Sequence, residues 1–387
     1  MLKTSNPDGD LILVTWVPDE PGPARLQAER AWSEILSRLD AHGAVPLDER
    51  AFGSLASAPC LLGARRSVAR KRGEDLRVEP TYVEGLPADG GLGSLAGIHV
   101  VAARAVNGGG RWLKPEGRAC GRLVESPNAH LLSLCDVGVL APRRAALDPA
   151  DETSVTLRAA ETALSGEGWS FGEVCRTWFY LRDILDWYDG FNCARNEAFR
   201  RMGLMVPGCD DTIPASTGIG GRSARGGSCA LDLLAVRPKA TARFERRRLY
   251  NVRQNEATAY GSAFARGVCL DLGAMRYVFV SGTAAIDEHG ASVHPGDFRA
   301  QVVCTLENVA ALLEGAGAGL VDVEQATAFV KRPGDVEMFR HLAEASGLSD
   351  VPTVTTIADV CRDELLFELD AAAVLPAPGT STECDAS

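Results

Sequence analysis

The feature that most constrains the fold is an internal repeat. Residues 157–183 align with residues 306–332 without a gap. Each copy predicts a helix, a glycine-rich loop and a strand, and a second helix follows at residues 187–202 and 336–345. The aligned pairs include Leu157 with Leu306, Leu164 with Leu313, Gly166 with Gly315, Gly168 with Gly317, Val174 with Val323 and Tyr180 with Phe329. The shared order of elements favours duplication over chance similarity.

A second correspondence follows the repeated helices. In the first copy, residues 216–219 precede the apolar run 230–234, and the second copy ends in two similar runs. We interpret each set as a closing pair of strands. In this alignment Asp232 takes roughly the place of Glu368.

The repeat predicts an α+β protein of two tandem domains, in which mixed sheets are packed by helices. Residues 1–236 should form a degenerate N-terminal domain, residues 237–375 a C-terminal domain that carries the site, and residues 376–387 a flexible tail. Within the first domain, residues 50–95 are rich in Pro, Gly and Arg and are expected to be irregular. The Ser/Gly/Arg loop at 221–228 is expected to be flexible.

The last predicted strand carries a lone carboxylate, Glu368. Because side chains alternate along a strand, Phe367 and Leu369 should face one side and Glu368 the other. A glutamate held in an enclosed site has a raised pKa and can donate a proton near neutral pH. The alternative is a strand glutamate that faces water, and this segment alone does not separate the two.

Charge and cysteine content limit the partners. The formal net charge of -11 argues against a nucleic-acid binder, although arginines gather between Arg237 and Arg276 and leave an anionic small molecule open. Eleven cysteines without a CxxC pair and six histidines without ligand spacing argue against a disulfide framework and a metal site. The first residues are polar and no apolar run reaches membrane-spanning length, so we expect a cytoplasmic protein with no membrane partner.

Several motifs are similar to those of a known family. Residues 260–267, residues 280–284 and the strand of Glu368 resemble the core of the YjgF/Rid superfamily. The first half resembles the chorismatases more specifically. The residues that carry this likeness are Trp178, Phe179, Tyr180, Leu181, Arg182, Asp183, Trp187, Tyr188, Phe191, Asn192, Arg195, Asn196, Phe199, Arg200, Pro214, Ala215, Ser216, Thr217, Gly218 and Ile219.

The resemblance implies two tandem YjgF/Rid-like (chorismate mutase-like) domains that cleave chorismate into pyruvate and a cyclic carboxylic acid. It also implies a homotrimer, a role in secondary metabolism and no cofactor. Within the family, a cysteine seven residues before the catalytic glutamate resembles the mark of the branch that makes 3-hydroxybenzoate. Cys361 and Glu368 have this spacing.

The chemistry implied by the resemblance assigns roles to named residues. A protonated Glu368 would protonate the enolpyruvyl ether. Cationic donors must hold the substrate carboxylates. Arg266 is the first candidate and Lys331 or Arg332 the next, with a sheet-edge salt bridge as the alternative role of Arg266. Cys361 would shape the pocket, or alternatively pack as a core thiol. The other predicted pocket residues are Tyr260, Phe264, Gly267, Ser281 and Gly282.

Two other functions stay open. A related Rid-fold enzyme could act on another small acid, as imine deaminases do. Those proteins resemble one another in an arginine two places after a proline, and here Val354 stands two places after Pro352. A non-catalytic ligand-binding protein is the second alternative, since duplicated domains often keep a single working site.

Overall fold

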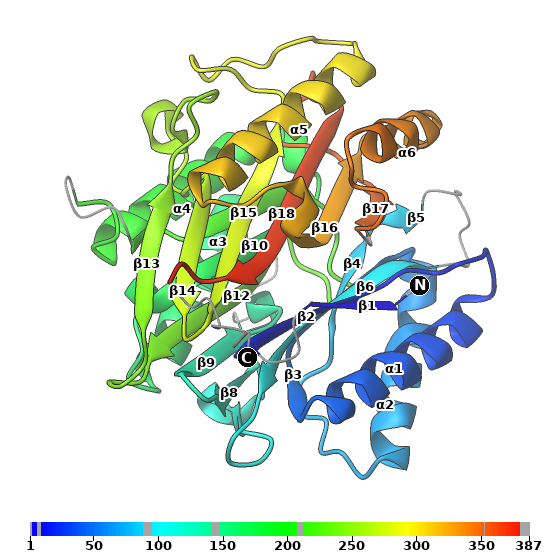
Figure 1. Ribbon diagram of the computed structural model, residues 1–387, viewed down its shortest axis with the longest axis vertical. Coiled ribbons are helices and arrows are strands. Elements are labelled where there is room, and N and C mark those ends of the chain that lie inside the picture. The colour runs from blue at the N-terminus through cyan, green and yellow to red at the C-terminus, as the bar shows by residue number, and fades with distance from the viewer. Residues whose placement is uncertain are drawn as a thin grey trace, which may run out of the picture.

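The computed structural model describes most of the chain, namely residues 2–5, 9–87, 95–140, 147–206, 212–351 and 353–379. These residues form three mixed sheets and six helices (Figure 1). Apart from β5, which lies at the edge of the third sheet, each sheet is built by a separate stretch of chain that also contains two helices. The α+β class with mixed sheets packed by helices is therefore confirmed.

We name the three stretches the first, second and third units. The first unit holds β1 (Leu2–Thr4), β2 (Leu11–Trp16), α1 (Ala24–Ala41), β3 (Ala44–Gly53), α2 (Ala58–Lys71), β4 (Thr81–Glu84), β5 (Leu86–Pro87) and β6 (Leu95–Arg104). The second holds β7 (Arg111–Leu113), β8 (Gly121–Glu125), β9 (Ala129–Leu134), α3 (Pro149–Ser165), β10 (Val174–Leu181), α4 (Tyr188–Arg201), β11 (Ala215–Gly220) and β12 (Cys229–Pro238). The third holds β13 (Phe244–Leu249), β14 (Gly267–Leu272), β15 (Met275–Ala284), α5 (Phe298–Gly315), β16 (Val323–Val330), α6 (Val336–Ala345), β17 (Thr353–Ile357) and β18 (Phe367–Pro376).

The three units share one topology. The sheet orders are β1-β2-β6-β3-β4, β11-β10-β12-β9-β8-β7 and β13-β14-β15-β18-β16-β17-β5. In every unit the last strand lies between the second and third strands of the shared plan, and a helix connects a parallel pair at one edge: β3–β4, β10–β11 and β16–β17. The predicted repeat thus comprises the second and third units, and the first unit is a further copy that the sequence alignment did not include.

Strand register defines which residues are equivalent. The third strand of each plan has a register shift near its start, after Pro46, Val174 and Val323. Counted from these shifts, Asp370 is equivalent to Asp232 and His99. Glu368 is equivalent to Ala230 and Gly97. The predicted equivalence of Asp232 with Glu368 is therefore wrong by two residues, a shift that keeps the same face of the strand.

Helices cover the outer face of each sheet, while the inner faces meet in the middle of the molecule (Figure 1). Along β18, Phe367 and Leu369 pack in the outer core with α5, whereas Ala372 and Val374 belong to the central core shared by all three units. The predicted alternation around Glu368 is confirmed. Main-chain pairing extends between units, because β5 of the first unit pairs with β17 at the edge of the third sheet.

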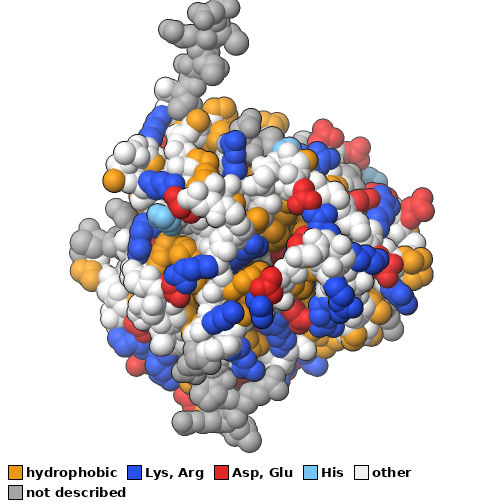
Figure 2. Space-filling model, turned by 90° about the horizontal axis from the view of Figure 1, so that it is seen from below, with side chains coloured by type: hydrophobic (Ala, Val, Ile, Leu, Met, Phe, Trp, Pro, Cys, Tyr) orange, Lys and Arg blue, Asp and Glu red, His pale blue; other side chains and the backbone are white. Residues whose placement is uncertain are grey.

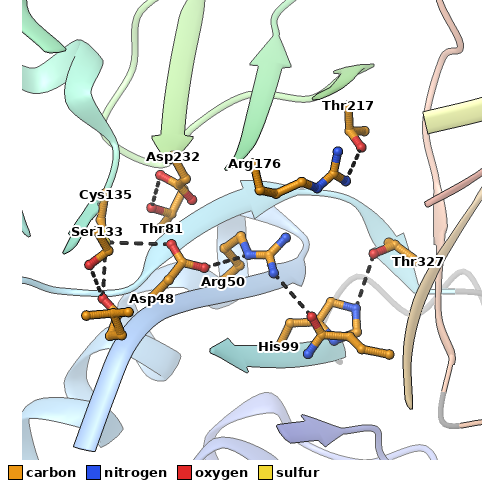
Figure 3. A network of polar contacts seen from close by, with 12 residues as sticks. Asp48, Arg50, Thr81, His99, Ser133, Cys135, Arg176, Thr217, Asp232 and Thr327 are labelled. Atoms are coloured by element: carbon orange, nitrogen blue, oxygen red, sulfur yellow. Dashed lines mark hydrogen bonds and ion pairs between the residues drawn. The ribbon is translucent and has the colours of Figure 1, made fainter. Parts of the chain in front are cut away.

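A buried polar network crosses the centre of the molecule (Figure 3). Arg50 donates to Asp48 at 2.7 Å and to Gln325 of the third unit at 3.4 Å. Its guanidinium lies 3.7 Å from the ring centroid of Trp178 in the second unit. His99 contacts Thr327 of the third unit at 3.2 Å. Buried charges are costly unless they are paired, so these contacts specify how the units meet.

Two hydroxyl contacts in the same network repeat the relation between neighbouring units. Thr81 on β4 donates to Asp232 on β12 at 2.8 Å, and the equivalent Thr217 on β11 donates to Asp370 on β18 at 2.9 Å. Each threonine belongs to the unit that precedes its aspartate partner. The third unit has Val354 at the equivalent position, where it packs in the apolar centre.

One local expectation was wrong, the flexibility of the loop 221–228 stays a prediction, and the predicted tail lies partly outside the described residues. Residues 50–87, the described part of the range 50–95, are not irregular, since they include the end of β3, α2 and β4. Charged side chains on the exposed face of α2 interrupt its apolar pattern in the sequence. The loop 221–228 is held in place by a hydrogen bond from Ser223 to Asp136 at 2.8 Å. The predicted tail begins at the last residue of β18, and its residues 380–387 lie outside the described part.

On the face shown in Figure 2, acidic and basic side chains are interspersed among apolar ones. This face lacks the continuous basic surface that nucleic-acid binders use. Within the described residues, no helix is both long and apolar enough to cross a membrane.

Replacing Arg50 should strongly destabilise the fold. Arg50→Met leaves Asp48 buried without its cation, which costs about 3–5 kcal/mol in the free energy of unfolding. Urea denaturation at neutral pH measures this loss. As a control, Arg25→Met removes an exposed pair with Glu29 on α1 and should leave the midpoint nearly unchanged. Equal effects of the two variants would contradict a structural role for the central network.

Candidate active site

A cavity of about 290 Å³ lies between the second and third units. Its size is close to the lower limit of small-molecule sites, roughly 300–1,000 Å³. The second unit supplies the loop before α4, the first turns of α4 and part of β11. The third unit supplies the segment before β14, the end of β15 and the segment that leads into β18. The lining residues are Leu185, Asp186, Trp187, Tyr188, Asp189, Asn192, Arg195, Ser216, Gly218, Ser262, Phe264, Arg266, Gly282, Ala284, Ile286, Cys361, Arg362 and Glu368.

Glu368 lies at the inner face of β18, between Ala284 of β15 and Phe329 of β16. Glu368 is only 4% exposed to solvent. Among the described residues, none donates a hydrogen bond to its carboxyl group. A β-carbon on Gly282 would overlap the Glu368 Oε1 atom, so this glycine makes the space that the carboxyl group occupies.

The surroundings of Glu368 favour its neutral form. Burial raises the pKa of Glu368 to about 8, and the nearby Asp370 carboxylate adds to the increase. Arg176 and Arg266 oppose it but do not cancel it. At neutral pH the side chain therefore holds a proton that it can donate into the cavity.

Two buried arginines reach the same cavity. Arg266 and Arg195 are each 1% exposed. The Arg266 guanidinium donates twice to the carbonyl of Asn255, at 3.0 and 2.6 Å, which fixes its orientation. Both guanidinium groups lie near the ring of Phe264, at 5.5 Å for Arg266 and 5.4 Å for Arg195. Planar cations held on an aromatic ring in this way suit a carboxylate ligand.

Helix α4 brings Arg195 to the cavity. Its buried residues recur at helical spacing, with Asp189 in the first turn and basic residues in the last, which suits the helix dipole. Asn192 accepts from Arg195 at 2.7 Å and from Ser262 of the third unit at 3.2 Å. Asn196 binds the backbone on both sides of Ser262, donating to the Gly261 carbonyl and accepting from the Ala263 amide. The helix thus holds the segment that leads to Arg266.

Ser281 joins the two units from behind the cavity. Its hydroxyl donates to the Ala265 carbonyl at 2.5 Å and accepts from the Ser216 amide at 2.8 Å. Ser216 itself lines the cavity, and Thr177 donates to its hydroxyl at 2.9 Å. Ser281 is therefore a structural support of the site.

Cys361 is half-buried in the cavity wall and packs against both the central core and the core of the second unit. Burial raises the pKa of its thiol to about 12, and the proximity of Glu368 adds to this effect. The sulfur is thus a neutral thiol at physiological pH and a poor nucleophile. Its contribution is the shape of the wall.

The rim of the cavity is formed by residues 185–189. Asp183, which precedes this loop, has a left-handed backbone with φ of 53°, a conformation that aspartate tolerates better than most residues. Trp187 donates from its indole to the Arg182 carbonyl at 2.7 Å. These features close the loop into a short turn before α4 begins, so that Asp186 and Asp189 lie at the entrance.

The predicted site residues divide into those that line the cavity and those that do not. Phe264, Arg266, Gly282, Cys361 and Glu368 line it together. Three others do not. Ser281 lies behind it, Gly267 begins β14, and Lys331 binds the exposed Asp363 at 2.8 Å. The side chain of Tyr260 is outside the described residues.

The second unit contributes residues that the sequence predictions left out, chiefly Arg195, Asn192, Ser216 and Tyr188. The sequence could have indicated these residues, because all four belong to the motifs that resemble the chorismatases. Their side chains fall on a helix and a strand that were interpreted as a degenerate copy, so they were not assigned to a site. No group of three His, Cys, Asp or Glu residues that could hold a metal is present in the described parts of the chain.

The chain is similar to several known proteins. The family model described as Endoribonuclease L-PSP matches residues 258–375. A 3-hydroxybenzoate synthase of Streptomyces hygroscopicus is 32% identical over 231 residues, and a RutC family protein of Pyrococcus abyssi is 32% identical over 98 residues. A crystal structure of a chorismatase superposes with a TM-score of 0.64 at 20% identity and covers 96% of this chain and 99% of that chain. The chain belongs to the RutC (YjgF/Rid) family.

The share of each protein that the alignment covers differs among these relatives. The alignment with the 3-hydroxybenzoate synthase spans 53% of this chain but 64% of the relative, and that with a chorismatase of S. hygroscopicus, at 29% identity, spans 60% of the relative. The chain thus matches less than two thirds of the length of these relatives. The RutC family protein matches 25% of this chain and 77% of its own length. The likeness to the chorismatases predicted from the motifs is confirmed.

The pKa of Glu368 predicts a pH-dependent gain in stability for Glu368→Gln. The unfolded carboxyl ionises at its ordinary pKa of 4.5, whereas the folded one keeps its proton up to about 8. The contribution of the protonated side chain is therefore fully present below pH 4.5 and is lost as pH rises towards 8. Glutamine stays neutral. The variant should match the wild type near pH 4.5 and exceed it by roughly 3–5 kcal/mol at pH 8. Urea unfolding at several pH values measures the difference, and parallel curves would contradict it.

Proposed function

We propose that the chain cleaves the enolpyruvyl ether of chorismate and releases pyruvate, with Glu368 as the general acid. The observation that carries this proposal is a neutral, buried carboxyl group that shares a cavity with two buried arginines. The relatives named chorismatase and 3-hydroxybenzoate synthase support the choice of substrate. An acid of this kind is worth about 10²- to 10⁴-fold in rate.

Binding would depend on Arg195 and Arg266. Chorismate carries two carboxylates, and each arginine offers planar N–H donors inside a partly enclosed space. Phe264 lies next to both guanidinium groups and provides an apolar surface for the substrate ring. The third cation of the lining, Arg362, donates to the Gly290 carbonyl and the Ser292 hydroxyl.

Glu368 would then transfer its proton to the terminal methylene carbon of the enolpyruvyl group. The ether carbon becomes an oxocarbenium ion, and the carboxylate left on Glu368 stabilises this cation electrostatically. The bond between the ring and the ether oxygen then breaks and pyruvate leaves, while the oxygen of the neighbouring ring hydroxyl bonds to the same ring carbon and passes its proton to the Glu368 carboxylate. The resulting epoxide would open at the carbon that first carried the hydroxyl and lose the proton from the carbon that keeps the oxygen, which gives 3-hydroxybenzoate. Pyruvate and 3-hydroxybenzoate together contain all the atoms of chorismate, so this reaction needs no oxidant and consumes no water overall.

We further propose that the cyclic product is 3-hydroxybenzoate. Cys361, which has the spacing to Glu368 that resembles this branch, lines the same cavity as the acid. Because its thiol is neutral, it would act by shaping the space around the ring and not by attacking it.

The imine deaminase reading has less support. In the imine deaminases an arginine at this position binds the substrate carboxylate. Here the position holds Val354, which is buried in the apolar centre, and the equivalent residue of the second unit is Thr217, so neither position carries a cation. A non-catalytic ligand-binding protein is the other alternative. Release of ammonia from an imino acid would favour the first alternative, and no product from chorismate would favour the second or another small acid as substrate.

We also propose that the protein is a cytoplasmic homotrimer that serves secondary metabolism. The mass in solution, measured by light scattering, tests the trimer.

Glu368→Gln should abolish pyruvate release. The amide has nearly the same shape but no proton of suitable acidity, so kcat should fall by at least about a hundredfold while substrate binding persists. Pyruvate formed from chorismate is measured with lactate dehydrogenase. In the wild type, activity should decline as pH rises through about 8, because the acid loses its proton. Asp363→Asn is the matched control, as this carboxylate is exposed and lies outside the cavity lining. Full activity of Glu368→Gln would exclude Glu368 as the acid.

Cys361→Ala should change the ratio of aromatic to dihydrodiol products. Removing the sulfur enlarges the cavity beside the substrate ring and alters how the ring is held after the ether breaks. Chromatography of the chorismate reaction gives the ratio. Cys60→Ala, which changes an exposed thiol on α2, serves as a control. An unchanged product profile would reduce Cys361 to a packing role.

A further inference from the structure

A closed cluster of three side chains lies directly behind the acid. Arg176 on β10 donates through the same nitrogen, Nη2, to Thr217 Oγ1 at 2.6 Å and to Asp370 Oδ2 at 3.0 Å. Thr217 donates to the same Asp370 oxygen at 2.9 Å. Arg176 is 2% exposed and Asp370 5% exposed. The cluster joins the second unit to the third and lines no part of the substrate cavity.

The cluster is adjacent to Glu368 in two ways. Asp370 is two residues further along β18 and so points to the same face of the strand. Thr217 Cγ2 lies 3.3 Å from the place where a β-carbon of Gly282 would stand, and that place overlaps the Glu368 carboxyl. A pair of opposite charges is therefore fixed behind the acid.

We propose that Arg176 and Asp370, held together by Thr217, are positioning residues that balance the charge behind Glu368 and so set the pH at which Glu368 gives up its proton. The effect of this control on catalysis rests on the proposed function. The effect on the proton affinity of Glu368 does not, because that affinity is measurable without substrate. Asp370 disfavours a second negative charge beside it, and Arg176 favours one. Their balance leaves Glu368 acidic enough to donate yet still protonated near neutral pH.

The other groups that face Glu368 come from several elements. β15 contributes Gly282 and Ala284, and β16 contributes Phe329, none of which titrates. The cationic side chains nearest the cavity are Arg266 before β14, Arg195 on α4 and Arg362 before β18. The Cys361 thiol is neutral at the relevant pH. Asp186, Tyr188 and Asp189 lie at the rim. Among the charged groups on the strands themselves, Arg176 and Asp370 are the two that act from behind.

The two residues should shift the titration of Glu368 in opposite directions. Asp370→Asn removes the repelling charge and leaves Arg176 in excess, so Glu368 should lose its proton at a pH lower by about one unit. Arg176→Gln leaves Asp370 in excess, so Glu368 should keep its proton to a higher pH. A merely structural defect would move both variants in one direction or neither.

The titration can be followed by ¹³C NMR of the full chain with labelled glutamate carboxyl groups, in which the Glu368 signal is assigned by its absence in Glu368→Gln. The pH profile of pyruvate release from chorismate is measured on the same proteins. Opposite displacements of the Glu368 signal support the proposal. No displacement, or displacement in one direction for both variants, overturns it. Absence of pyruvate from the wild type would refute the proposed function and leave the titration result standing.

Breaking a buried pair can prevent folding, and a double variant keeps the test decisive. Arg176→Gln combined with Asp370→Asn replaces the ion pair by two neutral hydrogen-bonding groups of similar size. Compared with Asp370→Asn alone, the double variant should hold the Glu368 proton to a higher pH, because it also lacks the guanidinium. Equal titrations of these two proteins would overturn a role for Arg176. Asp271→Asn, in a buried pair with Arg276 at the far end of β14 and β15, is the matched control and should leave the signal in place.

Discussion

The structure depends on the cost of burying charge where three sheets meet. Each sheet turns one face towards the centre, and that face carries arginine, aspartate and histidine as well as apolar side chains. Such groups are tolerated only when partners satisfy them, and the partners come from a neighbouring unit: Arg50 binds Gln325, Thr81 binds Asp232, and Arg176 binds Asp370. The polar contacts therefore fix the relative placement of the units, which the apolar packing alone would specify less sharply.

The cavity is a result of that placement. Its acid comes from β18 of the third unit, while much of its wall, including Arg195, comes from the second. Neither unit alone could enclose Glu368, because the strand face that carries it would then be open to water and its pKa would return towards the ordinary range. The contact between units thus supplies the low-dielectric surroundings that keep the proton on the carboxyl group. Packing and chemistry are linked through a single side chain.

Sequence patterns predicted the elements of the second and third units well, because both copies keep glycines and leucines at the same spacing. They predicted the strands at residues 11–16 and 97–103 but did not reveal that the first unit is a third copy, because β3 carries the charged run Asp48, Glu49 and Arg50 where the equivalent strands are mainly apolar. The predicted register was off by two at Asp232 because a two-residue shift leaves every side chain on the same face of the strand, so the alternating pattern does not distinguish the two registers. Arg195 was not assigned to the site because its helix belongs to the copy that was interpreted as degenerate. Contacts between distant segments, such as Arg176 with Asp370, leave no local signature.

Three equivalent junctions exist within the chain, but their residues at the position of Glu368 differ: glutamate at one, Ala230 and Gly97 at the others. Covalent linkage permits this divergence, since each junction can mutate independently, whereas identical subunits would have to change all three at once. It also makes the local concentration of each unit near its neighbours independent of how much protein is present. A site assembled this way would survive extreme dilution, a condition under which one built from separate chains would come apart.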